Sequence, residues 1–283
     1  MTRKVDLVQR FSNLLHHHLP SGENVLAKGM RHILTSPSQL IRPQLVYATN
    51  QAFHGSLDHA DGAALAIEYI HSFSLIHDDL PDMDDATTRR GAPCAHRLYG
   101  NGQAILIGDA LLCEAFQYIL NDSNTPSIQR LMLKALSKAS GYQGMTLGQS
   151  LDISPPNDLP AWIKCYQLKT GALFSAACIL GALSAGMDEF KYLLKLKRIG
   201  LKLGLCFQLQ DDLLDENELP SGKDKHLDQN NLIRWLGTKD TESLYNEEQS
   251  QCMSMIQSLP NPQPLITLSN TIFSRLCLTN AKN

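Results

Sequence analysis

Five aspartates lie within eight residues of one another, directly after an apolar segment: Asp78, Asp79, Asp82, Asp84 and Asp85. Proline cannot continue a helix interior and pushes the preceding residue out of the α region, so Pro81 predicts that the helix ends near Leu80. Asp78 and Asp79 then occupy its last turn, and Asp84 lies beyond it. Carboxylates crowded at a helix C-terminus are electrostatically unfavourable, so we expect a cationic partner. A solvated acidic loop is the alternative, whereas an EF-hand is disfavoured because its central Gly and twelfth-position Glu are absent.

A second acidic cluster lies in the apolar segment Phe207–Asp215, which reads FQLQDDLLD. Helical spacing of three and four puts four polar side chains on one face: Gln208, Asp211, Asp212 and Asp215. Such a face in an apolar setting is unfavourable unless cations neutralise it. Mg²⁺ binds one or two carboxylates and completes its coordination with water and phosphate oxygens. Two clusters that meet across a cavity would therefore hold a diphosphate ester through magnesium.

Cationic side chains accompany both clusters. Arg89 and Arg90 follow the first cluster, and guanidinium groups match phosphate oxygens bidentately, although they could equally form ion pairs with the acidic run. Lys169 opens a charge-free segment, where a lysine could also extend along the surface to reach water. Arg42 lies near the start of an earlier helix and Lys223 lies in a loop after the second cluster. Together these side chains supply the positive charge that bound diphosphates require.

The elements that carry these residues are predicted to be helices. Apolar residues recur at spacings of three and four in five segments: Ala60–Leu80, Gly102–Leu120, Ile128–Leu151, Ala161–Ala185 and Lys191–Leu214. Clear alternating strands are absent, and no low-complexity linker or fixed repeat divides the chain. Three prolines are expected to break the polar tail, Gln251–Asn283, into two short helices. We therefore expect one all-α domain over residues 1–283.

The overall composition indicates a soluble globular protein of the cytoplasm. Hydrophobic residues make up 43%, charged residues 19%, and the net charge is -3, which gives no sign of a nucleic-acid partner. Seven scattered cysteines without a CxxC pair suit reduced thiols better than disulfides or zinc ligands. The apolar run near the N-terminus is too short for a signal peptide. Thr170–Met187 carries no charge, but its small residues favour a buried core helix over a membrane span.

Three motifs give the chain a family resemblance. SLIHDDLPDMDDATTRRG, YQLKTGALFSAA and FQLQDDLLD resemble the trans-polyprenyl diphosphate synthase family, and GMTLGQSLD and ILIGDALL resemble its intervening segments. Similarity extends from about Leu26 to Lys223. The resemblance implies an isoprenoid synthase type I helical bundle around a deep central cavity, usually as a homodimer. It also implies condensation of isopentenyl diphosphate with dimethylallyl or geranyl diphosphate, with farnesyl diphosphate as the main product.

The resemblance also implies roles for the residues of both clusters and for their cations. The implied magnesium ligands are Asp78, Asp84 and Asp211, supported by Asp79, Asp82, Asp212 and Asp215. About three Mg²⁺ ions are implied when diphosphate is bound. The implied contacts of the allylic diphosphate are Arg89, Lys169 and Lys223, and those of isopentenyl diphosphate are Arg42, His71 and Arg90. Thr170 and Gln208 would face the developing carbocation.

The sequence departs from the family pattern at two lysine positions. The family's GKRxRP reads SQLIRP here, so Gln39 stands in place of a lysine that binds isopentenyl diphosphate and Leu40 in place of an arginine. Gln229 replaces a lysine of the allylic site. A hydrogen bond to a charged group contributes about 1.5–3 kcal/mol, so two losses could lower affinity by a factor on the order of 10² to 10⁴. A class I enzyme that does not use isopentenyl diphosphate and a non-catalytic subunit are therefore the alternatives to a working prenyl transferase.

Product length is predicted from the helix that carries the first cluster. Phe73 lies five residues before Asp78 and Ser74 lies four before it. A helix advances about 1.5 Å per residue, so Phe73 lies roughly 7 Å below Asp78 along the helix axis. A bulky ring at this depth would limit the growing hydrocarbon chain, and the resemblance associates an aromatic residue here with fifteen-carbon products. Ordinary core packing of Phe73 is the alternative.

Overall fold

The computed structural model describes residues 6–154, 158–218 and 232–274. The N-terminal half contains α1 (Leu7–His17), α2 (Val25–Leu34), α3 (Ile41–Ala52), η1 (Leu57–Ala60), α4 (Asp61–Asp78), β1 (Thr88–Arg89), β2 (Ala92–Pro93), α5 (Ala95–Tyr99) and α6 (Asn101–Leu120). The C-terminal half contains α7 (Pro126–Ser140), α8 (Met145–Ile153), α9 (Leu159–Tyr166), η2 (Gln167–Gly171), α10 (Ala172–Ser184), α11 (Phe190–Glu218), α12 (Ile233–Leu236), α13 (Thr238–Gln257) and α14 (Gln263–Phe273). The predicted all-α fold is confirmed, and β1 and β2 form only a two-residue antiparallel ribbon.

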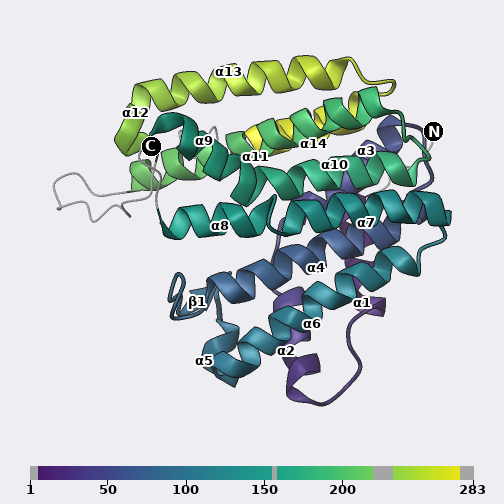
Figure 1. Cartoon of the computed structure of the whole chain (residues 1–283), viewed down its shortest axis with the longest axis vertical. Helices are drawn as coiled ribbons and strands as arrows, with labels where there is room; N and C mark the ends of the chain where they lie inside the picture. The colour runs from purple at the N-terminus through teal and green to yellow at the C-terminus, as the bar shows by residue number, and fades with distance from the viewer. Residues whose placement is uncertain (1–5, 155–157, 219–231, 275–283) are drawn as a thin grey trace.

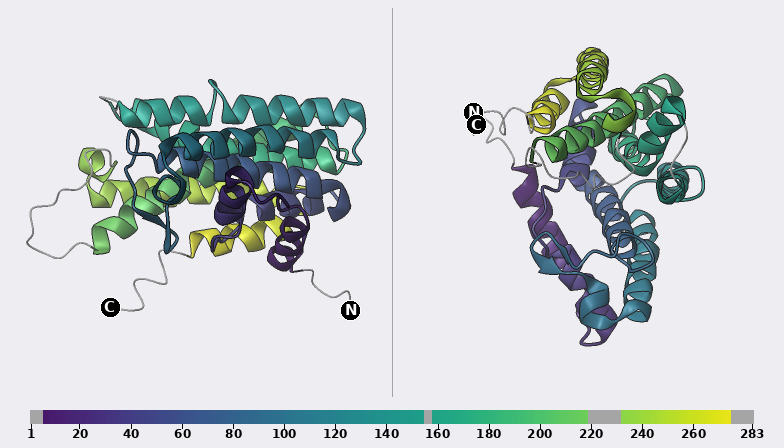
Figure 2. Two further views of the ribbon diagram at one scale, coloured as in Figure 1. Left: turned by 90° about the horizontal axis from the view of Figure 1, so that it is seen from below. Right: turned by 90° about the vertical axis from the view of Figure 1, so that its left-hand side faces the viewer.

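Helix α10 lies at the centre of the bundle and packs against α3, α7 and α11 (Figure 1). Helix α4 packs against α3, α6 and α10, while α13 and α14 cover α11 and α3 on the opposite side. Figure 2 shows the long helices running roughly side by side, with the short α5 and the β1–β2 ribbon gathered near one end. This arrangement brings the C-terminal end of α4 near the C-terminal half of α11, although about 130 residues separate the two acidic clusters in the sequence.

The helix boundary at the first acidic cluster is as predicted, because α4 ends at Asp78 and its cap is Asp79. The prediction of one helix over Ile128–Leu151 is wrong. Helix α7 ends at Ser140, and the chain turns before α8 begins at Met145. Gly144 allows this turn, since a Cβ atom at that position would lie 2.1 Å from the carbonyl oxygen of Ala139. Because of this break, α8 is a separate helix, and it packs against η2.

The C-terminal tail differs from its prediction in length. Its break falls at the prolines as expected, but the helix before the break is the 20-residue α13 rather than a short helix. The α13 sequence is polar on average, yet Thr241, Tyr245, Cys252 and Ile256 are buried at helical spacing and pack against the core. Because the buried residues form only a narrow stripe in a polar segment, apolar periodicity did not reveal the full length of α13.

The buried side chains form one connected cluster, with Trp162, Tyr47 and Tyr69 among its largest members. Two stretches of helix among the described residues are long and apolar enough to cross a membrane by length and composition alone: Asn101–Leu120 and Leu159–Ser184. The second is 78% buried inside the bundle and is the core helix that the sequence predicts for Thr170–Met187. The first, which is α6, is only 33% buried.

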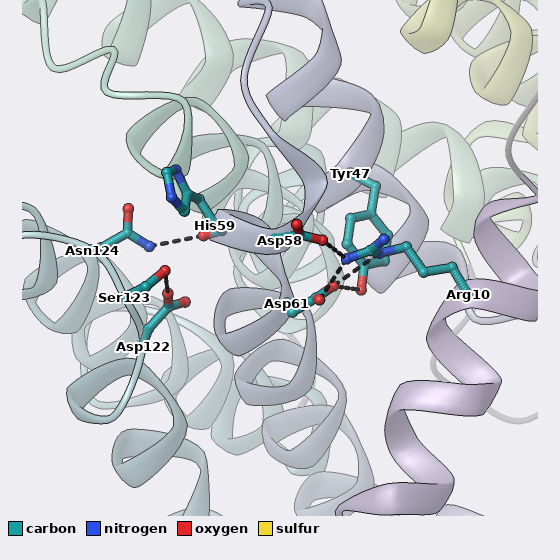
Figure 3. Close-up of polar contacts among 8 residues, drawn as sticks. All are labelled: Arg10, Tyr47, Asp58, His59, Asp61, Asp122, Ser123 and Asn124. Carbon is teal, nitrogen blue, oxygen red and sulfur yellow. Dashed lines mark hydrogen bonds and ion pairs between the residues drawn. The ribbon is translucent and has the colours of Figure 1, made fainter. Parts of the chain in front are cut away.

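A polar network ties α1, α3 and α4 together away from the acidic clusters (Figure 3). The Asp61 carboxylate accepts hydrogen bonds from the Tyr47 hydroxyl at 2.6 Å and from Arg10 Nη2 at 2.6 Å. Arg10 also reaches Asp58 at 2.5 Å, but the Asp58 side chain is 79% exposed and that of Asp61 only 23%. Asp61 is therefore the acceptor on which the buried Tyr47 hydroxyl depends.

We predict that Asp61→Ala lowers the free energy of unfolding by about 1–3 kcal/mol, because the Tyr47 hydroxyl and the Arg10 guanidinium lose their acceptor. Asp58→Ala is the matched control and should change it by about 0.5 kcal/mol or less, since this carboxylate is solvated. Urea unfolding followed by circular dichroism measures both. Equal effects of the two substitutions would contradict the structural role of Asp61.

Candidate active site

Aspartates from both clusters line one cavity of about 470 Å³, which we call the polar chamber. Asp78 and Asp84 come from the end of α4 and the turn after it, and Asp211 comes from α11. Four cations of the predicted site line the same chamber: Arg42, Arg89, Arg90 and Lys169. The structure therefore brings together acids and cations that are far apart in the sequence, as the motifs predict.

The turn after α4 directs some aspartates of the first cluster into the polar chamber and others away from it. The amide of Asp84 donates to the carbonyl oxygen of Asp78 at 2.9 Å, which folds the chain back so that Asp84 joins Asp78 at the chamber. Asp79 is buried and accepts a hydrogen bond from Arg89 Nε at 2.5 Å. Asp82 is exposed and lies outside the lining of the chamber. Asp79 thus orients a cation, whereas Asp78 and Asp84 present their carboxylates to the cavity.

Burial and crowding disfavour the charged form of these carboxylates. Burial raises the pKa of Asp78 to about 7, with Asp84 and Asp79 adding to the effect and Lys169 and Arg89 opposing it. Burial likewise raises the pKa of Asp84. A divalent cation at this position would favour the deprotonated form of both, because an opposite charge nearby lowers a carboxyl pKa.

The aspartates of the second cluster also divide into those that line the polar chamber and those that do not. Asp212 is buried and accepts a hydrogen bond from the Tyr166 hydroxyl at 2.8 Å, and burial raises its pKa to about 7. The amide of Leu232 donates to the same Tyr166 oxygen at 3.2 Å. Asp215 is exposed and lies outside the chamber lining, so among the aspartates of this cluster only Asp211 lines it. The sequence did not single out Tyr166, although its position three residues before Lys169 is a usable signal.

A single π-helical turn, η2, carries Lys169, which lines the polar chamber, and the neighbouring Thr170. Lys169 Nζ donates to Asp152 Oδ2 at 2.5 Å. Burial alone would lower the Lys169 pKa, but Asp152, Asp78 and Asp84 outweigh it and the pKa is raised. The Thr170 hydroxyl donates to Gln208 Oε1 at 3.1 Å, which joins η2 to α11. Asp152 is a functional residue that the sequence analysis placed in a motif without giving it this role.

A second group of cations surrounds His71. Arg42 Nη1 lies 3.1 Å from His71 Nε2, and Arg90 Nη2 lies 3.4 Å from the same atom. Burial holds the pKa of His71 well below its ordinary value, and the two arginines add to this, so the ring is neutral and Nε2 accepts from the guanidinium groups. Arg42 also lies 4.9 Å from the centroid of the Phe174 ring, a cation–π contact that fixes its direction.

Glu68 is a buried acid in the lining of the polar chamber that the sequence analysis missed. Burial raises its pKa to about 7, while Arg42 and Arg90 oppose that shift. Burial lowers the pKa of Arg42 to about 10 and also lowers the pKa of Arg90, and Glu68 opposes both shifts. A lone acid three residues before His71, inside an apolar helix, is the signal that identifies it.

A second cavity of about 490 Å³ continues from the polar chamber, and we call it the apolar chamber. Both chambers share Arg42, His71, Leu75, Asp78 and Lys169. Phe73, Ser74, Met145 and Ile153 line the apolar chamber and not the polar one. The Phe73 ring meets the His77 ring edge-on at 5.2 Å between centroids. His77 also lines this chamber, and its Nε2 atom lies 3.1 Å from the carbonyl oxygen of Ile105, a role that its sequence context did not indicate.

The residues that depart from the family pattern lie partly within the described structure. Gln39 is exposed and lines the polar chamber, beside Leu40, whose backbone is left-handed with φ of 51°. Lys223 and Gln229 lie outside the described residues. The structure therefore shows that a lysine at position 39 would add positive charge to this chamber.

The donor set suits Mg²⁺ bound together with a substrate. Across the part of the chain that the structure describes, no three Asp, Glu, His or Cys side chains converge as a complete metal site. Mg²⁺ needs only one or two carboxylates, because water and phosphate oxygens fill its remaining positions. Asp78, Asp84 and Asp211 around one chamber fit that requirement.

A helical bundle whose two aspartate clusters face one cavity defines the class I isoprenoid synthases. The polyprenyl synthetase family model matches residues 23–264. Farnesyl diphosphate synthase of Escherichia coli is 43% identical over 204 residues, which cover 70% of this chain and 68% of that protein. The enzyme of the same name from Haemophilus influenzae is 34% identical over 280 residues, 95% and 93% of the two chains. The chain belongs to the polyprenyl synthetase family and is a short-chain prenyl transferase.

Solved structures agree with this assignment. The geranyltransferase of Helicobacter pylori in complex with magnesium and isoprenyl diphosphate matches with a TM-score of 0.85 at 32% identity, over 94% of this chain and 95% of that one. Chloroplastic geranylgeranyl pyrophosphate synthase of Capsicum annuum is also similar, at 32% identity over 89% of this chain and 72% of that protein. The family uses magnesium, and its members differ in product length.

Proposed function

We propose that the chain condenses isopentenyl diphosphate with dimethylallyl and geranyl diphosphate, and that farnesyl diphosphate is its main product. The observation that carries the proposal is the convergence of Asp78, Asp84 and Asp211 with four cations on one chamber that opens into an apolar one. The similarity to two bacterial farnesyl diphosphate synthases supports the choice of product.

In this proposal the two groups of cations bind two different diphosphates. Arg89 and Lys169, together with Lys223, hold the allylic diphosphate, and Arg42, His71 and Arg90 hold isopentenyl diphosphate. Mg²⁺, about three ions held by the chamber aspartates, supplies the charge neutralisation that lets the diphosphate leave. Asp82, Asp212 and Asp215 are proposed only to support this site.

The chain's own side chains then control the carbocation. Thr170 and Gln208 present hydroxyl and amide oxygen atoms near the allylic carbon, and the apolar chamber excludes water from it. The double bond of isopentenyl diphosphate attacks the cation, forming the new C–C bond, and the released diphosphate accepts the proton that is lost. The described residues need no covalent nucleophile for this chemistry.

Turnover with and without isopentenyl diphosphate tests the proposal against its alternatives. We expect dimethylallyl or geranyl diphosphate to be consumed only when isopentenyl diphosphate is present, with products identified by mass spectrometry. Consumption without isopentenyl diphosphate would indicate a class I cyclase or phosphohydrolase. No consumption in either case would indicate a non-catalytic subunit.

We predict that Asp78→Ala and Asp211→Ala each lower kcat/KM by a factor of about 10³ or more, because each removes a carboxylate that holds charge-neutralising magnesium. Both side chains line a cavity rather than the core, so circular dichroism and the unfolding midpoint should change little. Asp240→Ala, an exposed aspartate on α13, is the matched control and should keep normal activity. Near-normal turnover in either chamber variant would contradict the magnesium role.

We predict that Gln39→Lys lowers the KM for isopentenyl diphosphate by about tenfold, because it restores a hydrogen bond from a charged group. Gln103→Lys, which adds the same charge at an exposed position on α6, should leave this KM unchanged. Steady-state kinetics with saturating geranyl diphosphate measures both. An unchanged or higher KM in Gln39→Lys would show that the chamber has been adapted to a different ligand.

We predict that Phe73→Ala shifts the main product from fifteen carbons to about twenty or more, because it removes the ring that limits chain growth in the apolar chamber. Phe73→Tyr keeps the ring and should keep the fifteen-carbon product. Mass spectrometry of the dephosphorylated products gives the chain lengths. A wild type that already makes long chains, or an unchanged product from Phe73→Ala, would exclude Phe73 as the limit.

We also propose that the protein is a homodimer of the cytoplasm. Ile105, Leu106 and Leu120 on α6 are 43%, 51% and 50% exposed, and exposed apolar side chains along one helix would be covered in an interface between copies. The described cysteines are free, which fits a reducing compartment. Sedimentation equilibrium should give twice the chain mass, whereas a monomer at micromolar concentration would contradict the dimer.

A further inference from the structure

A third cavity, of about 440 Å³, lies between α7, α9, η2, α10 and α11, and we call it the lateral pocket. Its lining shares no residue with either chamber of the active site. Ala172, Ala176, Ile179 and Leu201 give it an apolar floor. The prenyl transfer chemistry described above uses none of these residues.

Three lysines from three different helices line the lateral pocket: Lys138 on α7, Lys164 on α9 and Lys197 on α11. All three are exposed, and no aspartate or glutamate belongs to the lining. Within the described ranges, the structure records no ion pair for any of the three ammonium groups. A pocket that combines an apolar floor with three uncompensated cations is complementary to an amphiphile with a strongly anionic head group.

The charge of the pocket favours a diphosphate head group over a carboxylate. A fatty acid carries one negative charge and would leave most of the lysine charge uncompensated, whereas a diphosphate carries two or three. Linear hydrocarbon chains that end in a diphosphate are the substrate and product class of this enzyme family, so such a ligand is present wherever the enzyme works. We propose that the lateral pocket is a second, non-catalytic binding site for a prenyl diphosphate.

The lateral pocket and the active site share two stretches of backbone. In η2, Gln167 and Leu168 line the lateral pocket, and the next two residues, Lys169 and Thr170, line the apolar chamber. Gln143 likewise lines the lateral pocket, two residues before Met145 in the chamber. A ligand that displaces the outer residues of η2 therefore moves the inner ones.

Close backbone contacts hold η2 tightly, so it can transmit such a displacement. A Cβ atom on Gly148 would lie 2.1 Å from the amide nitrogen of Lys169, and one on Gly204 would lie 2.3 Å from Cα of Gly171. Two helices thus meet η2 without intervening side chains. A segment of π-helix inside a longer helix commonly marks a functional site. Occupancy of the lateral pocket should therefore change turnover without competing for the active site.

Inhibition kinetics with an unreactive ligand tests this site, and the test rests on the proposed prenyl transfer activity. The probe is farnesyl thiolodiphosphate, with geranyl diphosphate and isopentenyl diphosphate both saturating so that competition in the active site is suppressed. We expect the wild type to keep a non-competitive component that lowers kcat. A triple variant combines Lys138→Gln, Lys164→Gln and Lys197→Gln. Its non-competitive inhibition constant should rise at least about tenfold, while its kcat without the probe stays unchanged.

The matched control removes three exposed lysines outside the pocket, through Lys134→Gln, Lys191→Gln and Lys239→Gln, and should inhibit like the wild type. Ala135→Leu fills the pocket without changing charge and should also lose the non-competitive component. Purely competitive inhibition of the wild type, or equal inhibition of all variants, would overturn the proposal. Equal inhibition by laurate would overturn the assignment of the head group.

Equilibrium dialysis of labelled farnesyl thiolodiphosphate with the full chain separates failure of this site from failure of the proposed activity. We expect two bound molecules per chain for the wild type and one for the triple lysine variant. One per chain for both proteins would overturn the lateral site even if the enzyme proves active. Two bound molecules per wild-type chain and one per chain of the triple lysine variant would support the lateral site even if turnover is absent.

Discussion

Burial of carboxylates at the end of an apolar helix is the constraint on which the site depends. Asp78 lies where α4 stops, inside a mostly apolar bundle, and burial raises its carboxyl pKa to about 7 even with Lys169 and Arg89 nearby. The nearby Asp84 carboxylate raises the pKa of Asp78 further. Divalent cations bound in the chamber would favour the charged form of these carboxylates, and a chamber of about 470 Å³ is large enough to admit them together with a diphosphate.

The surrounding structure divides the acids between two tasks. One group faces the chamber, while Asp79 and Asp152 each hold a cation, Arg89 and Lys169, by a hydrogen bond of 2.5 Å. A charged side chain whose partner is fixed has fewer conformations to lose when it binds a phosphate. The two sets of residues together give the site both its charge and its geometry.

The sequence predicted the elements that local chemistry determines. Pro81 placed the end of α4 correctly, and the spacing in FQLQDDLLD correctly placed Gln208 and Asp211 on a face of α11 that lines the chamber. Asp212 and Asp215 were expected on the same face, but Asp212 is buried against Tyr166 and Asp215 lies outside the lining. The family resemblance gave Asp78 and Asp79 different roles, but local spacing alone could not separate them. Neighbouring residues on a last helical turn differ only in direction, and tertiary packing decides which is buried. Glu68 and Tyr166 depend on contacts with distant segments, so periodicity did not reveal them. The turn at Gly144 rests on a local backbone contact with Ala139, which apolar periodicity does not register.

Calorimetric titration of an unreactive allylic analogue, dimethylallyl thiolodiphosphate, with and without Mg²⁺ tests the central claim most directly. If paired aspartates hold the diphosphate through magnesium, replacing Mg²⁺ with EDTA should weaken binding by a factor of about ten or more, equivalent to at least about 1.4 kcal/mol. Equal affinity in Mg²⁺ and in EDTA would show that the cations of the chain hold the diphosphate alone, and would contradict this account.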